Sequence, residues 1–173
     1  MVEEARFRHD AVSIGGSVDL LFLDLYRLVT LFMASRELAR AAGTNEYHPF
    51  AFLGELHDRS EAARLLVNIA VRARASLDTD PDQTWRKQRG TPRQVGTLKT
   101  ASEGRWKNSA LSFRDACNKI IHAHSITFDR RRGAGTIHPH IASVVYLHGD
   151  HNGREWKAAL KVIDFVDCAF RAS

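Results

Sequence analysis

The chain has 173 residues, of which 44% are hydrophobic and 26% charged, so it belongs with folded globular proteins and not with disordered ones. From this length we expect a single domain, residues 1–173. The formal net charge of +5 permits an anionic partner such as nucleic acid. It does not demand one, because a modest basic excess often serves solubility alone.

The N-terminal part of the chain gives no sign of export or of a membrane anchor. Residues 1–10 are charged and lack the apolar run of a signal peptide. The most apolar stretch, residues 21–36, is interrupted by Asp24 and Arg27 and is shorter than the roughly 20 residues that span a bilayer. We therefore expect a cytoplasmic protein.

Two long helices are predicted first, at about 18–42 and about 50–77. Gly43 suits the end of the first helix, and Pro49 ends any regular structure before the second. Apolar residues recur at helical spacing along both helices. They are Leu21, Leu25, Leu28 and Phe32 in the first, and Leu53, Leu56, Leu65, Leu66 and Ile69 in the second. A first helix that is apolar on most sides predicts the centre of a bundle.

Residues 78–107 are predicted to form a long basic loop. A loop of this length in a compact domain is usually functional or disordered. Trp85 and Trp106 interleave with Lys and Arg, and this composition is typical of segments that contact nucleic acid. Four of these cations are the candidate phosphate contacts: Arg86, Lys87, Arg89 and Arg93. The alternative is a solvated connection whose tryptophans pack on the core.

A third helix is expected at about 108–123, followed by a β unit at 125–162 and a short helix at 163–172. Three alternating stretches, starting at Ser125, Ile141 and Arg154, read as antiparallel strands, with a hairpin loop around Asn152. Cys117 and Cys168 fall in apolar segments, so we expect core thiols and no disulfide. The predicted fold class is mainly α, a helical bundle of long antiparallel helices with a small β elaboration.

Arg114, Asn118 and His122 recur every four residues and form a polar stripe on the third helix. An arginine followed by a polar residue and then by a histidine on one helix of a bundle resembles the HEPN superfamily. Its motif is an arginine, usually followed by Asn, Asp or His, with the histidine within two helical turns. Here Arg114 is followed by Asp115, and His122 lies one residue beyond the usual interval.

The resemblance implies an RNA-binding or metal-independent endoribonuclease domain, such as those of toxin–antitoxin or phage-defence systems, in which an antitoxin or another protein is the partner. His122 would transfer the proton, Arg114 would hold the phosphate, and Asn118 would orient either of them. Arg114 and His122 are about 12 Å apart along the helix axis. Two groups this far apart on one helix cannot act on the same phosphate unaided. In HEPN proteins dimerisation brings two such helices together, so the resemblance implies a homodimer. No cofactor is implied.

Two other interpretations remain open. A polar stripe is common on amphipathic helices, so the chain could instead be a non-catalytic structural or protein-interaction module in which His122 merely caps a helix. Two close histidine pairs, His138 with His140 and His148 with His151, could supply zinc ligands. Their spacing fits no zinc pattern, so we expect histidines in loops and no metal.

Overall fold

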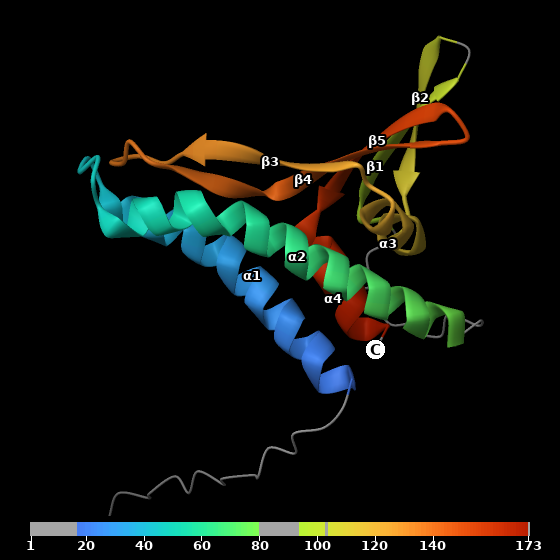
Figure 1. The fold of residues 1–173 in the computed structure, drawn as a ribbon, viewed down its shortest axis with the longest axis horizontal. Helices are drawn as coiled ribbons and strands as arrows, with labels where there is room; N and C mark the ends of the chain where they lie inside the picture. Colours follow the sequence, from blue (N-terminus) through green and yellow to red (C-terminus); the bar gives the residue numbers. More distant parts are fainter. Residues whose placement is uncertain (1–16, 80–93, 103, 173) are drawn as a thin grey trace, which may run out of the picture.

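The computed structural model describes residues 17–79, 94–102 and 104–172. These residues form four helices and five strands (Figure 1). In order they are α1 (Ser17–Ala42), α2 (Pro49–Thr79), β1 (Gly96–Ser102), β2 (Arg105–Leu111), α3 (Phe113–Ile121), β3 (Ser125–Arg132), β4 (Pro139–His151), β5 (Arg154–Lys161) and α4 (Val162–Arg171).

The five strands form one antiparallel sheet in the order β2-β1-β5-β4-β3. The fold is therefore α+β, and the predicted mainly α, HEPN-like bundle is wrong. The two long helices, the three later strands and the last helix lie close to their predicted positions. The error comes from β1 and β2, which lie in the predicted basic loop 78–107 and in the first residues of the predicted third helix.

The strands β1 and β2 escaped prediction because β2 carries little of the alternation that marks a half-buried strand. Six of its seven residues are exposed, and only Leu111 is buried. In Figure 1 the β1–β2 hairpin rises away from the helices, so neither face of β2 is covered along most of its length. The pairing of β1 with β2 runs from Gly96 opposite Leu111 to Ser102 opposite Arg105. Helix α3 therefore begins at Phe113 and not at about residue 108, as predicted.

The two faces of the sheet differ in polarity. Alternate residues of each strand point to opposite faces, and the strand register sorts them into rows. The covered face carries Ile126, Phe128, Val145, Leu147, Trp156, Ala158 and Leu160. The open face carries Thr97, Lys99, Trp106, Asn108, Ser125, Thr127, Tyr146, His148, Lys157 and Ala159. In Figure 1, α1, α2 and α4 lie below the sheet, against its covered face.

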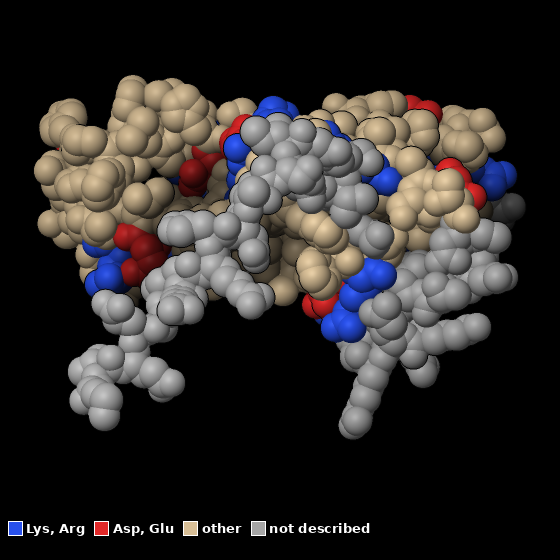
Figure 2. Space-filling view, turned by 90° about the horizontal axis from the view of Figure 1, so that it is seen from below, with Lys and Arg blue, Asp and Glu red and all other residues tan. Residues whose placement is uncertain are grey.

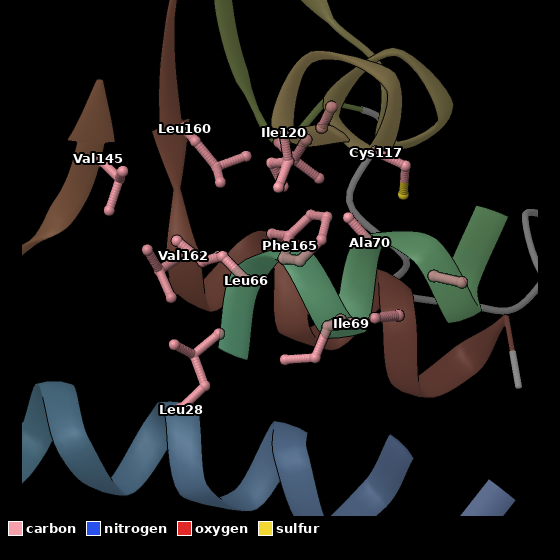
Figure 3. Close-up of a cluster of buried hydrophobic side chains, with 14 of the residues drawn as sticks. Leu28, Leu66, Ile69, Ala70, Cys117, Ile120, Val145, Leu160, Val162 and Phe165 are labelled. Atoms are coloured by element: carbon pink, nitrogen blue, oxygen red, sulfur yellow. The ribbon is translucent and has the colours of Figure 1, made fainter. Parts of the chain in front are cut away.

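The core lies between that covered face and the helices, as Figure 3 shows for Leu28, Ile69 and Phe165. The rings of Phe113 in α3 and Phe165 in α4 pack with centroids 5.3 Å apart. Cys117 and Cys168 are buried there, as expected for core thiols. Burial raises the pKa of the Cys117 thiol to about 12.

The β4–β5 turn matches the predicted hairpin loop. Asn152 and Gly153 adopt positive φ angles of 53° and 72°, and both values belong to the tight turn that joins twisted antiparallel strands. The turn holds His151 and Arg154 as the last paired residues of the ladder.

A buried hydroxyl joins three elements. Ser35 of α1 is 4% exposed. Its Oγ donates to Asp58 Oδ2 of α2 at 2.6 Å and accepts from the backbone N–H of Ile141 in β4 at 3.2 Å. Burial raises the pKa of Asp58, and the hydrogen bond from Ser35 opposes that rise. The helix pair is thus tied to the sheet by a polar contact as well as by packing.

Large apolar side chains remain exposed on the two long helices. They include Leu23, Tyr26 and Met33 of α1, and Phe52, Leu53, Val67 and Val71 of α2. Figure 2 views the molecule from below, the side of the helices, and most of the described surface there is uncharged. No helix within the described ranges is both long enough and apolar enough to cross a bilayer. Exposed apolar area of this kind usually marks an interaction surface.

The Ser35 contact predicts a measurable loss of stability. Ser35→Ala should leave a buried backbone N–H and a carboxylate without this partner and should lower the free energy of unfolding by about 1–3 kcal/mol. It should also raise the pKa of Asp58 further. Urea unfolding monitored by circular dichroism measures the first effect. Ser60→Ala, at an exposed serine of α2, should change little; an equal loss in both variants would contradict the assignment.

We propose that the exposed apolar face of α1 and α2 forms a homodimer. Tyr26 and Met33 are 69% and 67% exposed, so Tyr26→Glu with Met33→Glu should convert the dimer to a monomer without unfolding it. Light scattering at micromolar concentrations measures the mass. Thr127→Glu on the open face of the sheet is the matched control and should remain dimeric. A monomer mass for the unaltered protein would refute the proposal.

Candidate functional site

The third helix is short and strongly two-faced. Its N-cap is Ser112, whose Oγ accepts from the backbone N–H of Asp115 at 3.2 Å and donates to Asp115 Oδ2 at 2.6 Å. This reciprocal pair caps the helix. The buried side carries Phe113, Ala116, Cys117 and Ile120. Because that apolar side is fixed against α2 and α4, the opposite side must present its polar residues outward.

The chain turns sharply after α3 and is anchored on the sheet. His122 ends the helix and donates its backbone N–H to the carbonyl of Asn118 at 3.0 Å. Two residues later, the backbone N–H of His124 bonds the carbonyl of His148 in β4 at 2.8 Å. This bond holds His124 beside both the end of α3 and the β4–β5 hairpin.

A hollow of about 540 Å³ lies at this junction. Three segments line it: the polar side of α3, the residues just after it, and the ends of β4 and β5. The lining residues are Asp115, Asn118, Lys119, His122, His124, Asp150, His151 and Trp156. We call this place the α3 hollow. It brings together three imidazoles, one ammonium group and two carboxylates.

Contacts within the α3 hollow hold several of these groups. The Nζ of Lys119 lies 4.3 Å from the ring centroid of Trp156. Partial burial lowers the pKa of Lys119, and nearby Asp115 opposes that shift. His124 Nε2 and Asp150 Oδ2 are 3.5 Å apart, so a protonated His124 forms an ion pair with Asp150. A carboxylate beside an imidazole favours one ring orientation and stabilises its charged form.

Gly149 leaves room for the tryptophan that forms the floor of the hollow. A Cβ placed on Gly149 would lie 2.3 Å from Cζ2 of Trp156 and 3.1 Å from the carbonyl oxygen of His122. The indole is buried and the carbonyl belongs to the backbone, so neither can move aside easily. The absence of a side chain at Gly149 therefore sets the distance between β4, Trp156 and the end of α3.

The predicted stripe is divided by the structure. Asn118 and His122 line the α3 hollow together, as their spacing suggests. Arg114 does not line it. Its Nη2 contacts Asp78 Oδ1 at 2.5 Å and its Nη1 contacts the carbonyl of Leu77 at 3.4 Å, so it ties α3 to the C-terminal end of α2.

Sequence reasoning missed Lys119, His124 and Asp150 as members of the site. The repeat of histidine at 122 and 124 was the available signal for His124. Nothing in the sequence pairs these histidines with Asp150, because the contact depends on how the β4–β5 hairpin meets the end of α3.

The predicted phosphate contacts Arg86, Lys87, Arg89 and Arg93 lie outside the described residues, as does Trp85. Other members of the same basic segment are described: Lys99 in β1, and Arg105 and Trp106 in β2. They stand on the sheet and not in a loop.

The two histidine pairs do not gather into one site. His138 Nε2 bonds the carbonyl of Asn45 at 2.9 Å, and His148 lies on the open face near Thr127. His140 lines a different hollow, between α1 and β4, where burial and the charges of Arg36 and Arg131 lower its pKa. Within residues 17–79, 94–102 and 104–172, no group of three or more His, Cys, Asp or Glu side chains is placed to hold a metal ion.

The hollow between α1 and β4 is larger, about 700 Å³, but its lining contains fewer imidazole groups than that of the α3 hollow. Apolar and small residues of α1 and β4 make up most of its lining, and His140 is its only imidazole. We place the candidate site in the α3 hollow because proton transfer near neutral pH requires groups that titrate there, and histidine is the side chain that ordinarily does.

The placement of Arg114 gives a test of its role. Arg114→Ala and Asp78→Ala each remove the same part-exposed ion pair, so both should lower the free energy of unfolding by roughly 0.2–1 kcal/mol. The double variant should lose less than the sum of the two single losses, because the shared ion pair is counted only once; Asp78 also pairs with Arg74, and Arg114 also bonds the Leu77 carbonyl. Chemical unfolding of the three proteins measures this coupling. If Arg114→Ala abolished an activity that Asp78→Ala preserved, a direct catalytic role for Arg114 would be restored.

Comparisons of the chain with protein-family models, with curated proteins and with solved structures give no match.

Proposed function

We propose that the α3 hollow cleaves RNA without a metal ion. The observation that carries this proposal is the convergence of His122, His124 and His151 with Lys119 in one hollow. General acid–base chemistry needs one group that accepts a proton and another that donates one, and an imidazole with a reference pKa near 6.5 can do either at neutral pH. A neighbouring ammonium supplies the positive charge that a phosphodiester requires.

The reaction uses the strand's own 2′-hydroxyl as the nucleophile. One imidazole takes the proton of that hydroxyl as the 2′-oxygen bonds to phosphorus. The bond from phosphorus to the 5′-oxygen breaks, and a second, protonated imidazole donates a proton to the leaving oxygen. The products are a 2′,3′-cyclic phosphate and a 5′-hydroxyl. His122 and His124 are the two candidates, because they flank the turn after α3 and both face the hollow.

The remaining residues have supporting roles in this proposal. Lys119 balances the charge that accumulates on the phosphate. Asp150 Oδ2 lies 3.5 Å from Nε2 of His124 and can orient that ring. Asn118, on the same side of α3 as His122, presents an amide that can bond either an imidazole or the substrate. Trp156 is buried and forms the floor of the site.

A second candidate function is a non-catalytic interaction module. The exposed apolar side chains of α1 and α2 favour it, because they provide a contact surface that needs no chemistry. The two functions are separable, since the α3 hollow contains none of those apolar residues.

Histidine substitution tests the cleavage proposal. His122→Ala and His124→Ala should each lower the rate of cleavage of a mixed RNA pool at least about a hundredfold, the usual contribution of a general acid or base. Unfolding temperature should hardly change, because both side chains are exposed. His57→Ala, at an exposed histidine of α2, is the matched control and should keep full activity.

The pH and metal dependence of the same assay complete the test. Because one group must be deprotonated and the other protonated, the rate should show a bell-shaped dependence on pH. EDTA should leave the rate unchanged. A rate that EDTA abolishes, or that survives both histidine substitutions, would show that the nuclease lies elsewhere or that the preparation is contaminated.

A further inference from the structure

Aromatic and cationic side chains cross the open face of the sheet on a diagonal. The line begins at Tyr146 in β4, passes Lys157 in β5 and Lys99 in β1, and ends at Trp106 in β2. The strand register sets this order, since Lys157 pairs with Lys99, and Trp106 lies two residues from Asn108, the partner of Lys99. Strand spacing and rise give the diagonal a length of about 20 Å.

Lys99 and Lys157 are direct cross-strand partners with the same charge. Side chains in such a pair start about 5 Å apart, and like charges placed opposite one another destabilise a sheet. Within the described part of the chain, neither lysine has a carboxylate partner within ion-pair distance. No described carboxylate therefore neutralises either lysine, and an external anion placed between the two side chains would be attracted by both.

The aromatic rings at the two ends of the diagonal are accessible. Trp106 is 45% exposed and Tyr146 is 39% exposed, although both stand on strands of an otherwise well-packed domain. The Nζ of Lys157 lies 5.0 Å from the centroid of the Trp106 ring. An accessible indole with an ammonium group beside it can stack on a base while the lysine contacts the adjoining phosphate.

We propose that this open face binds single-stranded nucleic acid, with bases on Trp106 and Tyr146 and phosphates between Lys99 and Lys157. The strand must be single because only unpaired bases can stack on these rings. Glu155 and its cross-strand partner Asp150 are acidic groups on the same face, and Glu155 lies two residues from Lys157. The surface is distinct from the α3 hollow, so it binds whether or not that hollow cleaves RNA.

Fluorescence anisotropy with the full-length chain tests the proposal. The probe is a labelled 2′-O-methyl oligoribonucleotide of about 12 residues, within the usual site size for such surfaces and resistant to cleavage. Trp106→Ala should weaken binding about tenfold, as expected for the loss of one stacked base, and Trp106→Phe should restore most of it. Tyr146→Ala should act in the same direction. The duplex form of the probe should bind more weakly than the single strand.

The lysine pair has its own prediction and control. Lys99→Ala with Lys157→Ala should weaken binding and flatten the slope of log affinity against log salt by about 1.4, because two phosphate contacts are lost from a single strand. Lys107→Ala is the matched control, since it removes a lysine from the opposite face of the strand that carries Trp106. It should leave affinity within about twofold of the unaltered value.

The outcomes separate this inference from the proposed cleavage. His122→Ala should abolish cleavage and leave the binding measured by anisotropy unchanged. Trp106→Ala should weaken that binding but leave the cleavage of a dinucleotide unchanged, because a dinucleotide is too short to reach the sheet. Equal affinity for duplex and single strand, or a loss in Lys107→Ala as large as in the Lys99/Lys157 double variant, would overturn the inference. Absence of cleavage with normal single-strand binding would overturn only the proposed function.

Discussion

The one-sided polarity of the five-stranded sheet is the constraint on which the rest of the structure depends. Its covered face has apolar rows on β4 and β5 that must be shielded from water, and the helices provide that shield. The open face carries lysine, threonine and accessible aromatic rings, and therefore needs no cover. A register shift of one residue would exchange the two faces, so the pairing of β4 with β5 fixes both the core and the exposed chemistry.

The same constraint explains why the α3 hollow forms where it does. Helix α3 must place Phe113, Cys117 and Ile120 against α2 and α4, and this leaves its polar side toward the end of the β4–β5 hairpin. The backbone bond from His124 to His148 then connects the hollow to the sheet. The proposed proton-transfer groups and the proposed strand-binding face thus share β4, although no side chain serves both.

Strong periodicity was enough to predict α1, α2, β3, β4, β5 and α4. The sequence could not reveal β2, because a strand exposed on both faces has no apolar alternation, and it could not reveal β1, because its Gly, Lys, Thr and Ser residues resemble loop composition. Helical spacing correctly grouped Asn118 with His122. It could not show that Arg114 would form an ion pair with Asp78, far away in sequence, and so would not line the α3 hollow. His124 and Asp150 come into contact only through the tertiary structure, so the local sequence around either residue does not predict that contact.

Cys117 lies on the buried side of the same helix whose polar side lines the hollow. With its pKa raised to about 12, almost none of this thiol is ionised at neutral pH, and the thiolate is the form that reacts with alkylating agents and oxidants. The sulfur therefore becomes reactive only when α3 leaves the core. The rate at which Cys117 is alkylated in the native protein therefore measures how often α3 separates from the core.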